Sequence, residues 1–200
     1  MTQTVVLATR NRHKLGEILE LLPGLKLELK TLDDFPGAPD VVEDGGTLEE
    51  NAARKAKSAA LFCGLWAIAD DTGLEVAALG GAPGVYSARY AGPGCSYGDN
   101  NLKLMAELSG LPPEKRAARF RCVMALSSPT GLVIMVEGRL EGRIAPAPSG
   151  ANGFGYDPLF LVAASGKTLA ELTPAEKNAV SHRAAAVGKI EPYLKRLMAG

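Results

Sequence analysis

The sequence predicts an α/β fold, in which strands and helices alternate near the N-terminus and an antiparallel hairpin follows. The apolar segment 5–8 is typical of a buried strand, and an amphipathic segment and an alternating strand over 25–30 complete a β-α-β unit. Another buried strand, 66–69, ends at the adjacent carboxylates Asp70 and Asp71. Ligands of open α/β sheets bind at this edge, so the two acids indicate a metal or catalytic site. An ordinary Asp-Thr-Gly turn is the alternative.

The first helix is expected between the polar turn 9–13 and Pro23-Gly24, which ends it. The segment 33–46, after the second strand, is a loop rich in proline, glycine and acids. The apolar residues of the helix recur at helical spacing and predict one buried face, made of Leu15, Ile18, Leu19 and Leu22.

A second helix is predicted over 47–62. Thr47 and Glu50 have the spacing of a capping box at its start, and Gly64 supplies a C-terminal stop. The segment 80–98, dense in Gly, Pro and Tyr, is long enough to be a functional loop.

The middle of the chain predicts antiparallel strands after a third helix near 100–108. Segments 118–127 and 132–137 have the pattern of a hairpin joined across 128–131, and a third strand is expected around 139–144. Together they would form an antiparallel lobe.

A second glycine-rich loop, 150–158, leads into an apolar strand at 159–162. The residues from Thr173 to Glu176 form another capping box and open the C-terminal helical region. Helical spacing would place Lys177 and Ser181 together and send the next two residues elsewhere. Either the helix breaks near Ser181, or the cations of this region do not converge.

Composition restricts the class of protein. The chain has 200 residues, 46% of them apolar, which is enough for a sizeable core without disulfides. A formal net charge of zero argues against a nucleic-acid partner or a membrane-surface partner. The three cysteines are widely spaced, and no apolar run approaches membrane-spanning length. We therefore expect a cytoplasmic protein.

The turn between the first strand and the first helix is a candidate phosphate site. A helix start directs free N–H groups and a positive dipole end at such a turn, and basic side chains reinforce the preference for an anion. A solvated turn is the alternative. P-loop and dinucleotide-fold interpretations are disfavoured, because Leu161 and Pro158 stand where the two glycine motifs require glycine. The candidate residues are Thr9, Arg10, Asn11, Arg12, His13 and Lys14.

Acidic side chains of the loop and second helix could join the Asp-Asp pair around a hard cation such as magnesium. A solvated acidic loop is the alternative, above all for Asp44 and Glu49. Lys55 is either exposed, as is usual for lysine, or part of a shared pocket. The acids are Glu43, Asp44, Glu49 and Glu50.

Two aromatic residues, Phe154 and Tyr156, lie in the second glycine-rich loop. Ring faces and backbone donors there can serve a planar base, and core packing is the competing explanation. Lys177, His182 and Arg183 add a second cationic group near the C-terminus.

Six motifs occur in order along essentially the whole chain: Thr9-x-Asn11-x-x-Lys14, Glu50-Asn51-Ala52, Ala69 to Leu74, Gly80 to Arg89, Phe154 to Pro158, and Ser181-His182-Arg183. Together they closely resemble the inosine triphosphate pyrophosphatase family, whose bacterial members are called XTP/dITP pyrophosphatases. A joint match of six motifs is far more specific than any one of them.

The resemblance implies an α/β fold with a long mixed central β-sheet flanked by helices, and two lobes with a nucleotide cleft between them. We accordingly expect a single domain over 1–200, with the hairpin near 118–137 in one lobe, and a homodimer. The implied activity is magnesium-dependent cleavage of a purine nucleoside triphosphate to a monophosphate and pyrophosphate. The implied substrates are the non-standard nucleotides ITP, dITP and XTP, and the implied role is cleansing of the nucleotide pool.

The resemblance also implies roles for individual residues. It implies that the turn from Thr9 to Lys14 binds the triphosphate. It also implies that Asp71 takes part in catalysis and metal binding and that Thr72 contacts the substrate. Glu43 matches the second metal-binding acid. Arg10 stands where the family usually has glycine, so either the turn tolerates a side chain or Arg10 adds a phosphate contact. The implied substrate contacts, chiefly at the base end, are Phe154, Gly155, Tyr156, Asp157, Lys177, His182 and Arg183.

For the chemistry we expect water to attack the α-phosphorus, with Asp71 accepting its proton or positioning it. Asp70 and Glu50 would be supporting acids. Magnesium, Lys14 and Lys55 would neutralise the phosphates and the leaving group.

Selectivity is expected to rest on the 6-keto edge of the purine, paired with donors from the 154–157 backbone and from His182 or Arg183. A pyrophosphatase for other modified nucleotides is the alternative within this chemistry. A nucleotide-binding or RNA-binding module without turnover is the alternative from another class.

Overall fold

The computed structural model describes residues 3–22 and 27–199. They form two compact units, each with its own hydrophobic core. Three long strands contribute to both units: β3 (Trp66–Val76), β5 (Ala117–Ser127) and β6 (Val133–Ile144). Unit 1 comprises Met1–Asp71, Cys122–Gly138 and Arg183–Gly200, and unit 2 comprises Thr72–Arg121 and Arg139–His182. The expected hairpin is thus divided between the units, and the single domain with a cleft between lobes stays a prediction.

The sheet of unit 1 contains the predicted β-α-β unit. Strand β1 (Gln3–Leu7) pairs in parallel with β2 (Leu27–Thr31), and helix α1 (Arg12–Leu21) connects them. On its other side β1 pairs in parallel with β3, with Val5 opposite Trp66. The strand order in this unit is β2-β1-β3-β5-β6.

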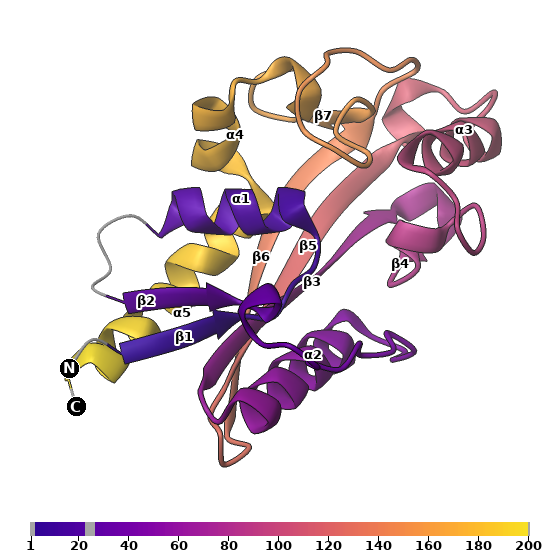
Figure 1. Ribbon diagram of the computed structural model, residues 1–200. Helices are drawn as coiled ribbons and strands as arrows, with labels where there is room; N and C mark the ends of the chain where they lie inside the picture. The colour runs from indigo at the N-terminus through magenta and orange to yellow at the C-terminus, as the bar shows by residue number, and fades with distance from the viewer. Residues whose placement is uncertain (1–2, 23–26, 200) are drawn as a thin grey trace. The chain divides into compact units, whose positions relative to one another are not determined.

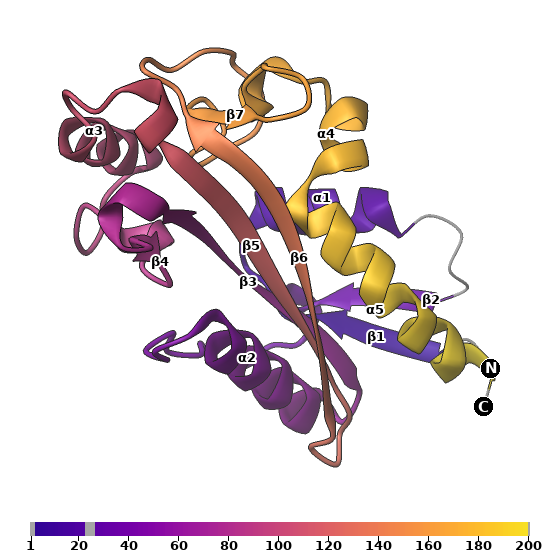
Figure 2. The same cartoon turned by 180° about the vertical axis from the view of Figure 1, so that it is seen from behind.

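Helices cover both faces of this sheet. Helix α2 (Leu48–Cys63) lies on one face, and α1 and α5 (His182–Ala199) lie on the other, as Figures 1 and 2 show. The face toward α1 and α5 carries the core of the unit, because alternate strand side chains point to it. That core includes Val5, Leu7, Ile18, Ile68, Met124, Ile190 and Leu194.

The prediction of the buried face of the first helix is wrong at one position. Ile18 is buried, but Leu19 is 44% exposed. Leu19 lies about 100° around the helix from Ile18 and so turns away from the sheet. The stop expected at Pro23-Gly24 and the start of the strand expected over 25–30 lie outside the described residues.

Helix α2 has the predicted ends. The Thr47 side chain accepts the Glu50 N–H at 3.1 Å, and Gly64 ends the helix with a φ of 66°. The reciprocal half of the expected capping box is replaced, because the Glu50 carboxylate accepts the N–H of Gly46 at 2.7 Å. Buried alanines, such as Ala52 and Ala56, form the face of α2 that is turned to the interior.

The strand that carries the two acids is longer than expected. Strand β3 continues through Asp70 and Asp71 to Val76, so the alternative of a turn at this point is wrong. The two carboxylates are buried within the strand. Burial of this kind is tolerated because each carboxylate has a cationic partner, as described below.

In unit 2 the sheet is antiparallel, so the complete sheet is mixed, as expected. Strand β4 (Pro83–Gly84) pairs with β3, and β7 (Phe160–Val162) pairs with β6. The third strand expected around 139–144 is instead the second half of β6. A side chain at Gly142 would approach the Phe160 ring to 2.7 Å, so glycine here admits the close neighbour strand.

The helices of unit 2 confirm two further predictions. Helix α3 (Tyr97–Glu107) lies near the expected range, and α4 (Pro174–Val180) begins with the capping box at Thr173. Ser181 is extended between α4 and α5, so of the two alternatives for the C-terminal helical region, the break near Ser181 is present. Among the described residues no helix is both long and apolar enough to cross a membrane. The core of this unit includes Leu74, Leu104, Phe120, Tyr156, Phe160 and Leu172.

Candidate active site

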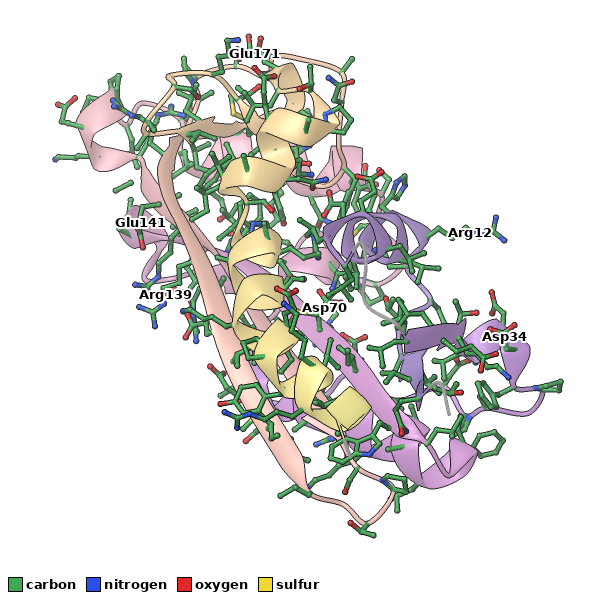
Figure 3. The ribbon with its side chains drawn as sticks, turned by 90° about the vertical axis from the view of Figure 1, so that its left-hand side faces the viewer. Arg12, Asp34, Asp70, Arg139, Glu141 and Glu171 are labelled. Atoms are coloured by element: carbon green, nitrogen blue, oxygen red, sulfur yellow. The ribbon has the colours of Figure 1, made fainter. Side chains whose placement is uncertain are left out.

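The adjacent acids of β3 belong to two different polar networks of unit 1. Successive side chains of a strand point to opposite faces of the sheet. Asp70 therefore lies on the face covered by α1 and α5, and Figure 3 shows it beside α5. Asp71 lies on the face covered by α2, where its contacts are with Asn51 and Lys55.

On the first face, Asp70 is the centre of a buried charge network. Its Oδ2 lies 3.1 Å from Lys14 Nζ and 3.4 Å from Arg183 Nη2. The other arm of Arg183 contacts Glu17 of α1. Burial alone would raise the pKa of Asp70, but Lys14 and Arg183 hold that pKa well below its ordinary value. Asp70 is thus a permanent carboxylate that fixes two cations.

On the second face, Asp71 and Lys55 form the chemical centre. Asp71 Oδ1 lies 3.1 Å from Lys55 Nζ, and the same ammonium lies 3.3 Å from Glu43 Oε1. Asn51 donates its side-chain amide to Asp71 Oδ2 at 3.3 Å and accepts the Gly45 N–H at 2.9 Å. The Lys55 side chain is only 12% exposed and pairs with both Asp71 and Glu43, so the exposed alternative is wrong.

At this centre the negative charges outnumber the positive ones, because the ammonium of Lys55 lies near several carboxylates. Burial raises the pKa of Asp71 above its ordinary value despite the opposing charge of Lys55. Burial would lower the pKa of Lys55, but the surrounding carboxylates, chiefly Asp71 and Asp70, raise it. A carboxylate whose pKa is shifted toward neutrality, beside a lysine that stays charged, suits a general base next to an anionic substrate.

The same pair of acids has the donor chemistry for a hard cation. The oxygens of Asp71 and Glu43 converge on one ammonium, which stands in the position of a cation between them. Within 3–22 and 27–199 no three Asp, Glu, His or Cys side chains gather as a metal site. Magnesium, however, is held in proteins by one or two carboxylates together with substrate phosphates. Asp71 and Glu43 therefore fit the expected ion.

The remaining acids do not form the predicted cluster around one cation. Asp44 pairs with Arg54, and the Glu50 carboxylate holds the N–H of Gly46. Asp70 faces away from Asp71, for the reason given above. Glu50 consequently supports the centre through the backbone of the loop that carries Glu43.

The basic turn before α1 is organised by its own polar side chains. Asn11 caps the helix, and its Oδ1 accepts the N–H groups of His13 at 3.0 Å and Lys14 at 3.2 Å. Thr9 Oγ1 accepts the N–H of Asn11 at 3.2 Å. Two of the helix-start N–H groups that were expected to be free are therefore bonded within the turn. Of the basic side chains, Lys14 points to Asp70, whereas Arg12 extends away from α1 (Figure 3) and His13 is exposed.

Arg10 is directed at the acidic loop. Its guanidinium lies 2.6 Å from Asp40 and 3.7 Å from Asp33, and it donates to the Ala38 carbonyl at 3.0 Å. No described residue other than glycine has a positive φ, so the turn accepts a side chain at Arg10 without strain. The geometry therefore supports the expectation that the turn tolerates a side chain at Arg10.

In unit 2 the second glycine-rich loop is held by a buried ion pair. Asp157 Oδ2 lies 2.6 Å from Lys177 Nζ and accepts the Phe154 N–H at 2.9 Å. The Lys177 ammonium also lies 5.1 Å from the centre of the Phe154 ring. Tyr156 is a core residue whose hydroxyl donates to the Ser87 carbonyl at 2.9 Å, so core packing is the correct explanation for this ring.

The other residues that were predicted to contact the substrate belong to different parts of the structure. His182 is 3% exposed and stacks on Phe120, with 4.6 Å between ring centres and 14° between planes. Arg183, one residue later, belongs to the Asp70 network of unit 1. Thr72 is half-buried in β3 directly after Asp71. Contact of these residues with a substrate stays a prediction.

Three polar residues of these networks received no role from the sequence. Glu17 lies three residues after Lys14, a spacing that puts both on one face of α1 and could have indicated the network. Asn51 is a buried amide on an alanine-rich helix, a type of residue that is rarely buried without a partner. Asn101 donates to the Gly155 carbonyl from α3, and no local signal predicts that contact.

The fold and these networks define a class: an α/β protein whose acid–lysine centre, beside a basic helix start, is suited to a phosphate-containing substrate. The chain belongs to the Ham1 family, whose family model matches residues 5–193. This result confirms the family that the six motifs indicated.

Individual relatives match over nearly their whole length. A dITP/XTP pyrophosphatase of Geobacter sulfurreducens is 53% identical over 97% of each chain. One of Geobacillus kaustophilus is 47% identical and covers 98% of this chain and 96% of the relative. The solved structure of a HAM1 protein from Coxiella burnetii has a TM-score of 0.90 and 42% identity, covering 98% of this chain and 100% of that one. The α/β fold with a mixed sheet is therefore confirmed.

Proposed function

We propose that this protein is a magnesium-dependent nucleoside triphosphate pyrophosphatase that hydrolyses ITP, dITP and XTP and so cleanses the nucleotide pool. The observation that carries the proposal is the Asp71–Lys55–Glu43 arrangement, with the charge of Lys14 near enough to act on Asp71. Relatives that share about half of their residues with this chain over its length are named dITP/XTP pyrophosphatases.

The proposed reaction is the addition of water to the α-phosphorus. A bond forms between the water oxygen and phosphorus, the bond to the bridging oxygen breaks, and pyrophosphate leaves with the electron pair. Asp71 accepts the water proton, since its carboxylate is close to Lys55 and its pKa is raised by burial. Lys55 offsets the negative charge of the phosphates, and Lys14, which is held by Asp70, adds positive charge near Asp71.

Magnesium would be held by Asp71 and Glu43 and would supply charge neutralisation to the phosphates. Titration of the protein with Mg²⁺ by calorimetry, in the presence of a non-hydrolysable triphosphate, tests this assignment. Glu43→Gln should weaken the affinity for Mg²⁺ about tenfold or more, because one charged oxygen ligand is lost. Asp40→Asn, on the same loop, is the matched control and should leave that affinity unchanged.

Selectivity would come from donors of the loop 154–157 that pair with a 6-keto oxygen. The 6-amino group of adenine would face these donors without an acceptor, at a cost of about 1–3 kcal/mol. The buried Lys177–Asp157 pair keeps the loop in one conformation and so favours this selection. Guanine shares the 6-keto group, so its exclusion requires a pocket without an acceptor at the 2-amino position.

Product analysis decides the function. The purified protein is incubated with Mg²⁺ and, separately, with ITP, dITP, XTP, ATP, GTP and dTTP, and products are separated by ion-pair chromatography. Monophosphate and pyrophosphate from the first three nucleotides, with little from the others, is the expected result. Diphosphate and orthophosphate would show that another bond is cleaved, and turnover of other modified nucleotides alone would favour the alternative within this chemistry. No turnover at all would favour a nucleotide-binding module.

The assembly and location are proposals as well. We propose a homodimer, which multi-angle light scattering would detect as twice the 20.9 kDa chain mass. A cytoplasmic location is supported by the cysteines Cys63, Cys95 and Cys122, none of which forms a disulfide within the described residues.

A further inference from the structure

Helix α3 contacts the second glycine-rich loop of unit 2 at two consecutive residues. The side-chain amide of Asn101 donates to the Gly155 carbonyl at 3.0 Å. Tyr97, one turn earlier on the same face of α3, places its ring centre 6.0 Å from that of Phe154. A helix that is distant in sequence thus fixes the backbone of the loop.

The contact with the Gly155 carbonyl also orients a donor. The carbonyl of Gly155 and the N–H of Tyr156 belong to one planar trans peptide, so they point in opposite directions. Asn101 occupies the carbonyl side. Within 3–22 and 27–199 the Tyr156 N–H has no hydrogen-bond acceptor. It is therefore a donor without a protein acceptor among these residues, and its direction is favoured by Asn101.

Without Asn101 this peptide would lose the hydrogen bond that favours its present orientation. This peptide turns over by a change of ψ at Gly155 together with a change of φ at Tyr156, and glycine offers little steric resistance to the first of these. The flanking groups are anchored independently, Tyr156 by its hydroxyl on Ser87 and Asp157 by Lys177. A turned peptide would present a carbonyl acceptor in place of the N–H donor.

We propose that Asn101 is a positioning residue for base selectivity. By holding the Gly155 carbonyl, it keeps the Tyr156 N–H as a donor to the 6-keto oxygen of a purine and disfavours the peptide orientation that would accept from a 6-amino group. This inference rests on the proposed function and adds to it a residue and a peptide that make the distinction.

The variant Asn101→Asp tests the inference with one atom exchanged. A carboxylate has only acceptors, so it repels the Gly155 carbonyl and favours the turned peptide, whose N–H faces the new acid. The ratio of kcat/KM for ITP to that for ATP should fall about tenfold or more, because a matched donor is exchanged for an acceptor. Asn101→Ala, which removes the contact without reversing it, should shift the ratio less and in the same direction.

Asn100→Asp is the matched control on the same helix. Asn100 is a buried amide that, like Asn101, holds a backbone group, since it donates to the Ala88 carbonyl at 3.3 Å and accepts the Ala91 N–H at 2.8 Å. Its variant should lower thermal stability and leave the ratio unchanged, which separates loss of structure from loss of selectivity. If Asn101→Asp does not fold, the ratio in Asn101→Ala decides.

Two outcomes would overturn the inference, and they are distinguishable. A wild-type protein that prefers ITP, with an unchanged ratio in both Asn101 variants, would refute the role of Asn101 and leave the proposed function intact. A wild-type protein that hydrolyses neither nucleotide would refute both.

Discussion

Asp70 and Asp71 are neighbours in sequence, yet their carboxylates serve opposite faces of β3. Asp70 Oδ2 lies 3.1 Å from Lys14 Nζ on the side of α1, and Asp71 Oδ1 lies 3.1 Å from Lys55 Nζ on the side of α2. Strand geometry separates two acids that the sequence places side by side. Asp70 therefore pairs with Lys14 and Arg183, and Asp71 is left for chemistry.

The division of roles predicts the effect of Asp71→Asn. The amide keeps the size of the side chain but cannot accept a proton, so turnover should fall on the order of 10²–10⁴-fold with the fold retained. Initial rates of pyrophosphate release and circular dichroism measure the two properties. Asp44→Asn, at an exposed acid paired with Arg54, is the control and should keep wild-type rates. Near-normal turnover in Asp71→Asn would refute the assignment.

The buried network around Asp70 predicts a loss of stability in Arg183→Met. The Arg183 side chain is 2% exposed and contacts Asp70 and Glu17, so its removal takes away one of the two cations that pair with Asp70 and a cation that pairs with Glu17. The free energy of unfolding should fall by about 3–5 kcal/mol. Urea unfolding with an unchanged m value measures the loss.

The control for this variant is Arg196→Met on the same helix. Arg196 is exposed and contacts only the Tyr193 ring among the groups that the structure describes, so its loss should change the free energy of unfolding by less than about 0.5 kcal/mol. Equal losses in the two variants would show that the Asp70 network does not stabilise the fold.

Two glycines with the same backbone conformation predict different tolerance of alanine. Gly153 has a φ of 73°, and Gly166 has a φ of 67°, so alanine meets a similar backbone penalty at both. At Gly153 the added Cβ would also collide with the Asp157 carboxylate, whereas at Gly166 nothing lies within 4 Å. Gly153→Ala should therefore raise the KM for ITP, and Gly166→Ala should not. A rise of equal size in both would point to backbone strain alone.

The pH dependence of stability is predicted at Glu75 of unit 2. Its carboxylate lies 2.6 Å from Arg119 Nε and 3.1 Å from Arg121 Nη1. Although burial acts to raise the pKa of Glu75, hydrogen bonds from these two arginines lower it below its ordinary value. Because the folded pKa is the lower one, the stabilisation is fully present above the unfolded value of about 4.3 and is lost as pH falls through the folded value.

Comparison of the wild type with Glu75→Gln measures this contribution. The wild type should be more stable at pH 7 by no more than about 1 kcal/mol, because the pair is partly exposed, and the difference should vanish in acid. The exposed Glu114, replaced in the same way, should produce no difference at either pH. A difference between wild type and Glu75→Gln that persists in acid would show that packing, and not charge, is responsible.

Much of the fold was predictable from local patterns. The apolar strand of 5–8, the capping residues at Thr47 and Thr173, and the glycine stop at Gly64 each act through neighbours in the chain. The predictions that were wrong also have a common cause. The length of β3 and the continuity of β6 depend on partner strands and distant cations, which no local window contains.

The sequence by itself determined the family, through six ordered motifs, and the class of residues at the site, because acids, lysines and glycine-rich loops have local signatures. Only the tertiary structure decided which side chains meet: that Asp71 faces Lys55 while Asp70 faces Arg183, that Arg10 turns to the acidic loop, and that Asn101 holds Gly155. These contacts join residues up to 113 positions apart. Sheet pairing and helix packing bring such residues together, and spacing along the chain does not encode either.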